Sequence, residues 1–192
     1  MEIISDLNID VDKGVYEPSN DSFLLMELIE IDGDERVLEI GCGSGIISIH
    51  CASEGCEVTA VDISEKAVKN TLRNAERNGL DIDVKVSHLF SSLSGKWDII
   101  VFNPPYLPEI EELEHDPRWD GGKQGDEIIV EFLFKAGKSL SEEGKIYFVY
   151  SDRAPVERIH NLIERRYAVL DKISETFSFE TIYAVELLFE SE

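Results

Sequence analysis

Short runs of apolar residues alternate along the chain with longer segments in which apolar residues recur every three or four positions. Uninterrupted runs are typical of parallel strands buried on both faces, and the longer spacing is typical of amphipathic helices. The pattern predicts strands at residues 36–40, 57–61, 83–87, 97–102 and 145–150, and helices at 46–53, 65–78, 126–140 and 155–166. This alternation indicates an α/β fold with a mostly parallel sheet.

The two ends of the chain add further predicted elements. Residues 3–11 alternate loosely and predict a short edge strand within the N-terminal segment 1–14. Residues 168–176 and 181–189 predict two final strands that form an antiparallel hairpin. We therefore expect a Rossmann-like, doubly wound sheet of seven strands in a single domain, residues 1–192, without a separate substrate domain.

A helix is also predicted after Pro18. Ser19 or Asn20 suits its N-cap, because both side chains accept hydrogen bonds from free backbone N–H groups. Such a helix could lie across the mouth of a cofactor site, with Ser22 near its positive end. The apolar spacing alone favours an ordinary capped amphipathic helix, and its apolar residues are Phe23, Leu24, Leu25, Leu28 and Ile29.

Charge and composition narrow the classes of function. The net charge is −22, with 40 acidic and 18 basic residues, which argues against direct binding to naked nucleic acid and favours a protein partner or a basic substrate. A solvated, soluble surface explains most of these carboxylates. No apolar run has transmembrane length and no signal peptide is present, so we expect a cytoplasmic protein without membrane contact. Three cysteines without a C-x-x-C pair indicate neither a disulfide framework nor a metal site.

A glycine loop follows the first predicted strand, in the order Gly41-Cys42-Gly43-Ser44-Gly45. Strand, glycine loop and helix form the entry of a nucleotide-binding βαβ unit, where glycines let the backbone come close to a ligand. A dinucleotide fingerprint requires its third glycine at position 46, where this chain has Ile46. Glu39, two residues before the first glycine, suits a cationic ligand better than a diphosphate.

Polar residues also follow the second and third predicted strands. Asp62 ends the second strand, where a carboxylate can accept hydrogen bonds from both ribose hydroxyls of a nucleoside. It could instead cap the helix that begins at Ser64, but the glycine loop upstream favours the ribose. His88 and Leu89 follow the third strand, at the usual height for contact with an adenine base. Taken alone, His88 is more typical of an ordinary core or surface histidine.

The fourth predicted strand runs into Asn103-Pro104-Pro105-Tyr106. An amide or aromatic amine nitrogen is a poor nucleophile because its lone pair is delocalised. Two acceptors, the Asn103 side-chain oxygen and the Pro104 carbonyl, could take its two hydrogens and aim its lone pair at a methyl group, by orientation and electrostatics alone. The prolines fix φ, and the Tyr106 ring offers a stacking surface. A proline-rich turn is the alternative, which the glycine loop and Asp62 disfavour.

Residues 108–125 form the longest irregular segment, beside the expected reaction centre. A long loop in this position is a candidate substrate lid. Its acidity suits a basic substrate, although a solvated loop explains the composition almost as well. Its notable residues are Glu109, Glu111, Glu112, Glu114, Asp116 and Trp119.

These motifs resemble class I S-adenosylmethionine methyltransferases of the HemK/PrmC type. The resemblance lies in Glu39-x-Gly41-x-Gly43-x-Gly45, in Asp62 and in Asn103-Pro104-Pro105-Tyr106, and it spans about residue 15 to the end. The segments Val15-Tyr16-Glu17-Pro18-x-x-Asp21-Ser22 and Trp119-x-Gly121-Gly122-x-x-Gly125-x-Glu127 are similar to the short archaeal and eukaryotic branch. That branch methylates the glutamine of the Gly-Gly-Gln motif in class-1 translation release factors.

The resemblance implies a class I methyltransferase fold, S-adenosylmethionine as cofactor, and roles for particular residues. The candidate catalytic residues are Asn103, Pro104, Pro105 and Tyr106, which would hold the glutamine amide. The candidate cofactor-binding residues are Ser22, Glu39, Gly41, Gly43, Gly45, Asp62, Ile63, His88, Leu89 and Asn103. The family usually has Asp-Leu where this chain has His88-Leu89, and that Asp accepts a hydrogen bond from the adenine amino group. Either His88 accepts this hydrogen bond through a neutral ring nitrogen, or the contact is lost. In the first case, protonation of His88 would weaken cofactor binding.

The resemblance also implies partners. The substrate would be a class-1 release factor, alone or bound to its GTPase partner. Eukaryotic members of the family work with a small zinc-binding activator protein, so a similar subunit is expected here by analogy. Bacterial members carry an N-terminal helical substrate domain for which this chain has no room, so specificity would come from loops or from another subunit.

Two other functions stay open on the sequence. The Asn-Pro-Pro-Tyr motif is shared with adenine and cytosine amino-methyltransferases, which would flip a base onto Tyr106, but such enzymes need a basic recognition surface. A non-catalytic adenosylmethionine-binding subunit is the second alternative. The intact Asn103 and Tyr106 oppose it, whereas His88 in place of the family's aspartate keeps it open. In both enzyme hypotheses, Asn103→Ala should abolish turnover and spare cofactor binding.

Overall fold

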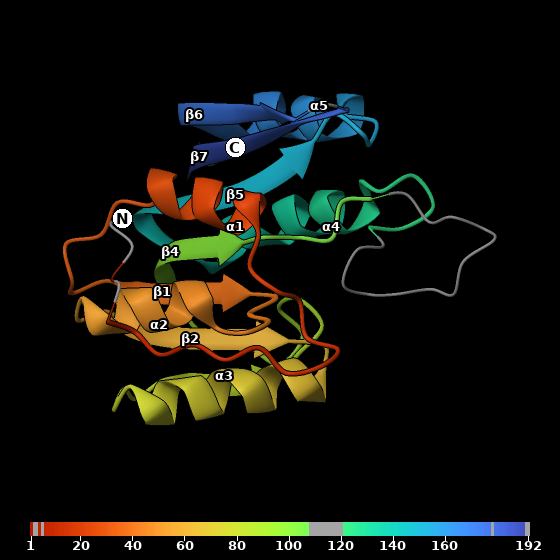
Figure 1. Cartoon of the computed structure of the whole chain (residues 1–192). Helices are drawn as coiled ribbons and strands as arrows, with labels where there is room; N and C mark the ends of the chain where they lie inside the picture. The colour runs from red at the N-terminus through yellow and green to blue at the C-terminus, as the bar shows by residue number, and fades with distance from the viewer. Residues whose placement is uncertain (2–3, 5, 108–120, 178, 191–192) are drawn as a thin grey trace.

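The computed structural model describes residues 1, 4, 6–107, 121–177 and 179–190. Its centre is one sheet of seven strands in the order β3-β2-β1-β4-β5-β7-β6 (Figure 1). The strands are β1 (Arg36–Ile40), β2 (Glu57–Asp62), β3 (Asp83–Val86), β4 (Trp97–Phe102), β5 (Leu140–Ser151), β6 (Tyr167–Phe177) and β7 (Glu180–Phe189). Strands β1 to β5 run parallel, and β7 is antiparallel to β5 and β6. The predicted doubly wound sheet with an antiparallel C-terminal hairpin is confirmed.

Helices cover both faces of this sheet (Figure 1). The first face carries α1 (Asn20–Leu28), α2 (Ile46–Ser53) and α3 (Glu65–Arg77), and the second carries α4 (Glu127–Ala136) and α5 (Glu157–Arg166). Each face has its own apolar core, with Leu25 and Ile49 fully buried on the first and Phe132 and Ile159 on the second. Among the helices of the described residues, none is long and apolar enough to cross a membrane.

The C-terminal end of α4 differs from the prediction. The helix was expected to reach residue 140, but it ends at Ala136, a 3₁₀ turn follows at Gly137–Ser139, and β5 already begins at Leu140. Leu140 pairs with Trp97 of β4 and is buried. A side chain at Gly137 would collide with the ring of Phe189. Strand pairing and close packing therefore override the helical periodicity of these residues.

The N-terminal segment also differs from the prediction. Residues 3–11 were expected to form an edge strand, but the described residues of this range belong to no strand, and they run along α3 instead. Their backbone groups bond to side-chain amides of α3. The apolar spacing of residues 65–78 places Leu72 on the inner face of α3, but Leu72 is 38% exposed, whereas Asn70 and Asn74 are fully buried. The helix turns this polar face inward because the segment that covers it needs donors and acceptors.

The strand order places a crevice between β1 and β4. From β1 the chain winds outward through β2 and β3, and from β4 it winds the other way through β5. Ligands of open α/β sheets bind at the carboxyl ends of the strands where the winding reverses. In the register of the sheet, Ile40 pairs with Phe102. The next residues, Gly41 and Asn103, therefore leave the sheet side by side.

Candidate active site

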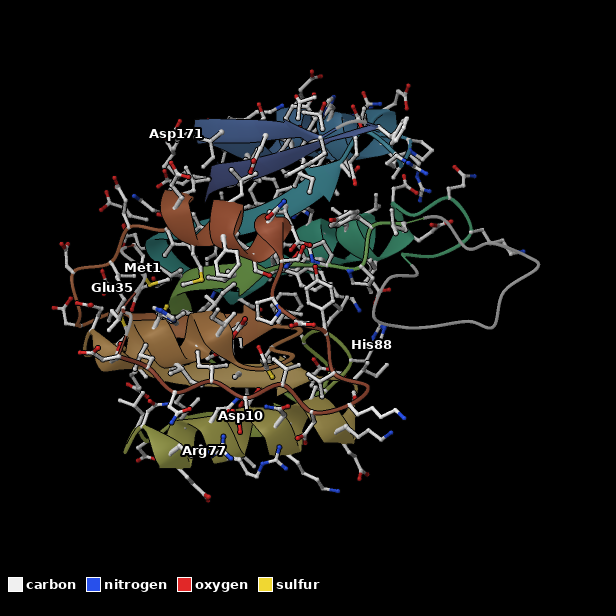
Figure 2. All side chains as sticks on the ribbon, in the orientation of Figure 1. Met1, Asp10, Glu35, Arg77, His88 and Asp171 are labelled. Carbon is white, nitrogen blue, oxygen red and sulfur yellow. The ribbon has the colours of Figure 1, made fainter. Side chains whose placement is uncertain are left out.

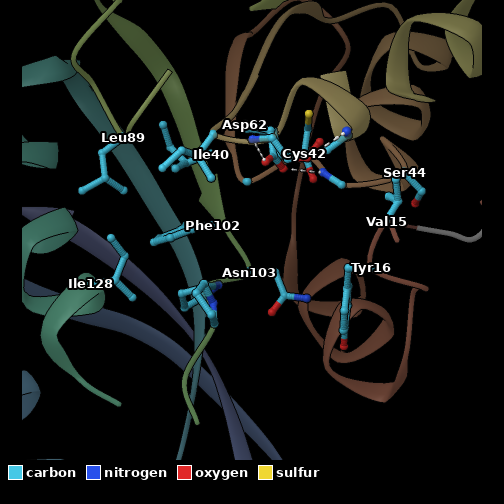
Figure 3. Close-up of a pocket in the computed structure, with 18 of the residues that line it drawn as sticks. Val15, Tyr16, Ile40, Cys42, Ser44, Asp62, Leu89, Phe102, Asn103 and Ile128 are labelled. Atoms are coloured by element: carbon cyan, nitrogen blue, oxygen red, sulfur yellow. Dashed lines mark hydrogen bonds between the residues drawn. The ribbon is translucent and has the colours of Figure 1, made fainter. Parts of the chain in front are cut away.

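A cavity of about 1000 Å³ opens at the carboxyl ends of the parallel strands. Its lining comes from residues 14–18, from α1, from the loops after β1 to β4 and from the start of α4. In Figure 3, Leu89, Phe102 and Ile128 lie on one side of the pocket and Tyr16 on the other, with Asn103 between them. The predicted site residues that line it are Ser22, Glu39, Gly41, Gly43, Asp62, Ile63, His88, Leu89, Asn103, Pro104, Pro105 and Tyr106.

Gly45 is the predicted cofactor residue that does not line the cavity. It stands at the N-cap of α2 with φ +82°, and a Cβ there would lie 2.7 Å from Thr71 Cγ2. The glycine is therefore required by the left-handed turn and by close packing against α3. Gly41 and Gly43 do line the cavity, also with positive φ. A Cβ on Gly41 would press on the Phe102 ring at 3.3 Å.

Asp62 fastens two loops at the end of β2. Its Oδ2 accepts a hydrogen bond from the backbone N–H of Gly43 at 3.0 Å, and its Oδ1 accepts one from the backbone N–H of Ser64 at 2.8 Å (Figure 3). Burial raises the pKa of the Asp62 carboxyl, and these N–H groups oppose the rise. Asp62 thus supports the start of α3 and also lines the cavity, so the two interpretations of this residue are compatible.

Glu39 is a buried carboxyl in the cavity wall, with 3% of its surface exposed. One of its oxygens accepts hydrogen bonds from the backbone N–H of Ser48, at 2.9 Å, and from the Ser48 hydroxyl. The Glu39 pKa is about 8 when three effects are combined. Burial raises it most, the bonds from Ser48 lower it, and the charge of Asp62 adds a smaller rise. A positive charge in the cavity would favour the ionised form of this group.

Asn103 presents an unpaired oxygen. Its side-chain nitrogen donates to Ser22 Oγ at 3.1 Å, which joins β4 to α1. Its Oδ1 is buried and has no hydrogen-bond partner among the described residues. Buried amide oxygens are almost always paired in folded proteins, so an unpaired one beside a cavity indicates a site for a donor from a ligand.

Asp21 holds the residues around Asn103 in place. Its carboxylate accepts hydrogen bonds from the Tyr16 hydroxyl at 2.8 Å, the Tyr106 hydroxyl at 3.1 Å and the Ser22 hydroxyl at 3.2 Å. Burial and the charge of Asp21 raise the pKa of both tyrosines, so their hydroxyls stay protonated and donate. The structure therefore gives Asp21 the role of a shared acceptor that links α1 to the residues around Asn103.

The remaining predicted residues form the outer half of the cavity. Leu89 is buried with a positive φ of 47°, which turns the chain after β3. His88 lies at the rim, half exposed, with its Nδ1 3.9 Å from Glu131 Oε1. Ile63 is exposed at the opening. An exposed apolar side chain, an apolar wall and a ring nitrogen are together suitable for a flat heterocycle.

Part of the predicted lid lies outside the described residues. The structure does not describe its acidic residues or its tryptophan, which are Glu109, Glu111, Glu112, Glu114, Asp116, Trp119 and Asp120. At its C-terminal end, Gly121 and Gly122 line the cavity. A Cβ on Gly121 would lie 2.7 Å from the Pro105 carbonyl oxygen, so this end of the segment packs directly on the predicted catalytic motif.

Sequence reasoning gave no role to several lining residues. Tyr16 and Asp21 were named only as members of the Val15–Ser22 motif, without a role of their own. The carboxylate of Asp21 in the first turn of an apolar helix could have indicated a functional residue. Lys66, Ile128 and Glu131 also line the cavity, but their positions in the helical pattern do not predict that they face a ligand site. Such residues come to the site through tertiary packing, which local patterns do not encode.

Comparison with known proteins is consistent with this geometry. The model of the methyltransferase small domain family matches residues 9–183. A Methanocaldococcus jannaschii protein assigned as a protein N5-glutamine methyltransferase is 41% identical over 142 residues, which cover 71% of this chain and 72% of that protein. Methyltransferase HEMK2 of Mus musculus is 32% identical over 170 residues, 80% of this chain and 79% of that protein.

A solved structure agrees with these relatives. It is the E. cuniculi Mtq2–Trm112 complex, responsible for the methylation of the eRF1 translation termination factor. It matches with a TM-score of 0.69 and 25% identity, over 91% of this chain and 98% of the other. The resemblance to HemK/PrmC-type enzymes is confirmed. The chain belongs to the methyltransferase small domain family, among the HEMK2 and protein N5-glutamine methyltransferases.

Proposed function

We propose that the protein methylates the side-chain amide nitrogen of the glutamine in the Gly-Gly-Gln motif of a class-1 release factor, with S-adenosylmethionine as the methyl donor. The main support for this proposal is the buried Oδ1 of Asn103, which has no hydrogen-bond partner among the described residues and lies at the cavity of a methyltransferase fold. The names of two similar proteins support this substrate. The M. jannaschii protein is assigned as a glutamine methyltransferase, and the E. cuniculi complex is responsible for methylation of eRF1.

The residues of the cavity suit S-adenosylmethionine. Gly41 and Gly43 bring backbone against the space at the end of β1, Asp62 offers carboxylate oxygens for ribose hydroxyls, and the apolar side near Leu89 suits adenine. The buried carboxyl of Glu39 suits a ligand that carries positive charge. When bound, this cofactor would supply a methyl group activated by its attachment to a sulfonium.

The motif after β4 would prepare the glutamine nitrogen. Asn103 Oδ1 and the Pro104 carbonyl would accept its two hydrogens, which withdraws the nitrogen from conjugation and directs its lone pair into the cavity. Ser22 keeps the Asn103 amide in the required orientation, and Pro105 limits backbone motion beside it. Tyr106, held by Asp21, would border the flat amide. Two neutral acceptors are sufficient. The methylated nitrogen would be a strongly acidic protonated amide, so its surplus proton would pass to water and no strong base is needed.

The decisive experiment is transfer of a labelled methyl group to purified release factor. We expect label on the natural factor and none on a variant whose motif glutamine is replaced by alanine. An Asn103→Ala enzyme should keep most of its affinity for S-adenosylhomocysteine, because the other cofactor contacts remain, and should transfer label at no more than a trace rate. Equal labelling of the factor without its glutamine would refute the proposed substrate.

We also propose a small activator subunit, as in the E. cuniculi Mtq2–Trm112 complex. The net charge of −22 suggests that a protein partner, rather than nucleic acid, brings the substrate to the cavity. Co-expression with the small subunit of the same organism should give a complex that migrates as one species on a sizing column. Activity of the chain alone at the rate of the mixture would refute the need for it.

A further inference from the structure

Two segments of the cavity wall lie next to each other. One is the N-terminal segment, which contributes Gly14, Val15 and Tyr16, and the other is the glycine loop, which contributes Gly43 and Ser44. A Cβ on Gly43 would lie 3.9 Å from Tyr16 Cβ, so the walls are in near contact. Neither wall is part of a strand or helix. Their separation must therefore be set by something else.

The N-terminal segment is fixed to α3 by a ladder of asparagine side chains, defined here as Asn70, Asn74 and Asn78. Asn78 exchanges two hydrogen bonds with the backbone of residue 8, at 2.9 and 3.0 Å, and Asn74 exchanges two with the backbone of residue 10, at 3.1 and 2.8 Å. Asn70 accepts from the backbone N–H of residue 12 at 2.6 Å and donates to the carbonyl of residue 10 at 2.8 Å.

The geometry of the ladder explains why it works. A side-chain amide has a donor and an acceptor, like a peptide group. Four residues of helix rise about 6 Å, and two residues of extended chain advance about 6.6 Å, so amides spaced by four can bond every second residue of an extended segment. The helix thus replaces a neighbouring strand. Two exposed ion pairs, Arg73–Asp12 and Arg77–Asp10, flank the ladder and contribute little (Figure 2).

Asn74 differs from the other two asparagines. Its second N–H donates to the Ser44 carbonyl at 2.9 Å, so one fully buried side chain holds both the N-terminal segment and the glycine loop. Asn78 bonds to residue 8 and to the carbonyl of Asn74 within α3, and neither partner belongs to the glycine loop. Thr71 of the same helix also holds the loop, through the Gly43 carbonyl at 3.1 Å.

We propose that Asn74 is a positioning residue for the cofactor, because it fixes the distance between the two walls that enclose it. The inference rests on the proposed use of S-adenosylmethionine. It assigns a role in affinity to the inward face of α3, although Asn74 does not line the cavity itself. Loss of the side chain would remove the group that bonds to both walls. The glycine loop would then be held through Thr71 and the segment through Asn70 and Asn78, so a ligand would have to bring the two walls into register itself.

The test compares Asn74→Ala with Asn78→Ala, a control from the same ladder that also loses two bonds to the segment but stands at the C-cap of α3 and is not buried. The dissociation constant of S-adenosylhomocysteine is measured by titration calorimetry. We expect Asn74→Ala to weaken binding about tenfold or more, and Asn78→Ala to change it less than about threefold. The milder Asn74→Ser keeps the measurement open if the alanine variant does not fold, and it should weaken binding in the same direction.

Hydrogen exchange supplies a readout that loss of stability alone would not move. In the natural protein, S-adenosylhomocysteine should slow exchange in peptides that cover residues 8–16 and 41–45 together, and in Asn74→Ala it should protect the glycine loop without the segment. Equal affinity and equal protection in Asn74→Ala and the natural protein would overturn the positioning role while the proposed function stands. Failure of the natural protein to bind the ligand would overturn both.

Discussion

The side-chain nitrogen of Asn103 lies 3.1 Å from the hydroxyl oxygen of Ser22, a residue 81 positions earlier in the chain. The direction of this bond follows from its neighbours. The carboxylate of Asp21 can only accept, so the Ser22 hydroxyl donates to it, and a lone pair of Ser22 Oγ is left for the Asn103 N–H. The amide oxygen of Asn103 is thereby turned away from Ser22 and left unpaired.

Ser22→Ala should slow methyl transfer by acting through Asn103. Without the serine oxygen the amide can rotate, and we expect kcat to fall about ten- to a hundredfold through lost orientation. Steady-state kinetics with a saturating cofactor concentration would measure this. The double variant Ser22→Ala/Asn103→Ala should be no slower than Asn103→Ala alone, because residues that act as a unit are not additive. Additive losses would contradict the chain of bonds.

Tyr106 should act through both its ring and its hydroxyl, with separable effects. Tyr106→Phe keeps the ring and removes the bond to Asp21, so we expect a modest loss, about fivefold in kcat/KM for the protein substrate. Tyr106→Leu also removes the aromatic surface and should cost considerably more. Tyr16→Phe is the matched control, since it removes a bond to the same carboxylate from the other side. Equal effects of Phe and Leu at position 106 would exclude a role for the ring.

The elements with strong local patterns could be predicted, and those defined by tertiary contacts could not. The predicted bounds of β1, α2 and β4 agree with the structure because each is a short, mainly apolar segment bounded by glycine or other turn residues. The sequence did not predict the asparagine ladder, because polar residues at helical spacing are normally expected on the solvent-exposed face of a helix. The site motifs were found since glycine and proline have backbone requirements that are visible in sequence. Asp21 was not, because its role depends on two tyrosines brought to it by the fold.

Glu39 should make the stability of the cofactor-free protein depend on pH. Its pKa is about 8 in the folded chain because of burial, whereas it has its ordinary, lower value in the unfolded chain. The folded state therefore binds more protons, and the contribution to stability is complete at low pH and is lost as pH rises through 8. Glu39→Gln should flatten this decline. Urea unfolding at about pH 5, 6.5 and 8 measures the free energy of unfolding of both proteins. If this free energy fell equally with pH in Glu39→Gln and in the natural protein, the expectation would be contradicted.

The same carboxyl should couple cofactor binding to proton release. A ligand with positive charge favours ionised Glu39, so at neutral pH binding should expel a proton. Calorimetry in buffers of different ionisation enthalpy would count it. S-adenosylmethionine should release more protons than S-adenosylhomocysteine, which lacks the sulfonium charge. Asp62 also has a raised pKa, and Glu39→Gln separates the two, because only release that persists in this variant can come from Asp62.

Replacement of Gly45 by alanine should destabilise the protein more than the same change at Gly79. Both glycines have positive φ, +82° and +66°, so each alanine carries backbone strain of about 1–2 kcal/mol. At Gly79 the new Cβ meets nothing within 4 Å, but at Gly45 it lies 2.7 Å from Thr71 Cγ2, and overpacking of this kind adds about 1–3 kcal/mol.

Chemical denaturation of both variants gives the cost of overpacking as the difference between their free energies of unfolding. Thr71→Ser removes the offending methyl group and keeps the hydroxyl that bonds to Gly43, so adding it to Gly45→Ala should recover part of the loss. If the two alanine variants were equally stable, contact with α3 would not be the reason for glycine at position 45.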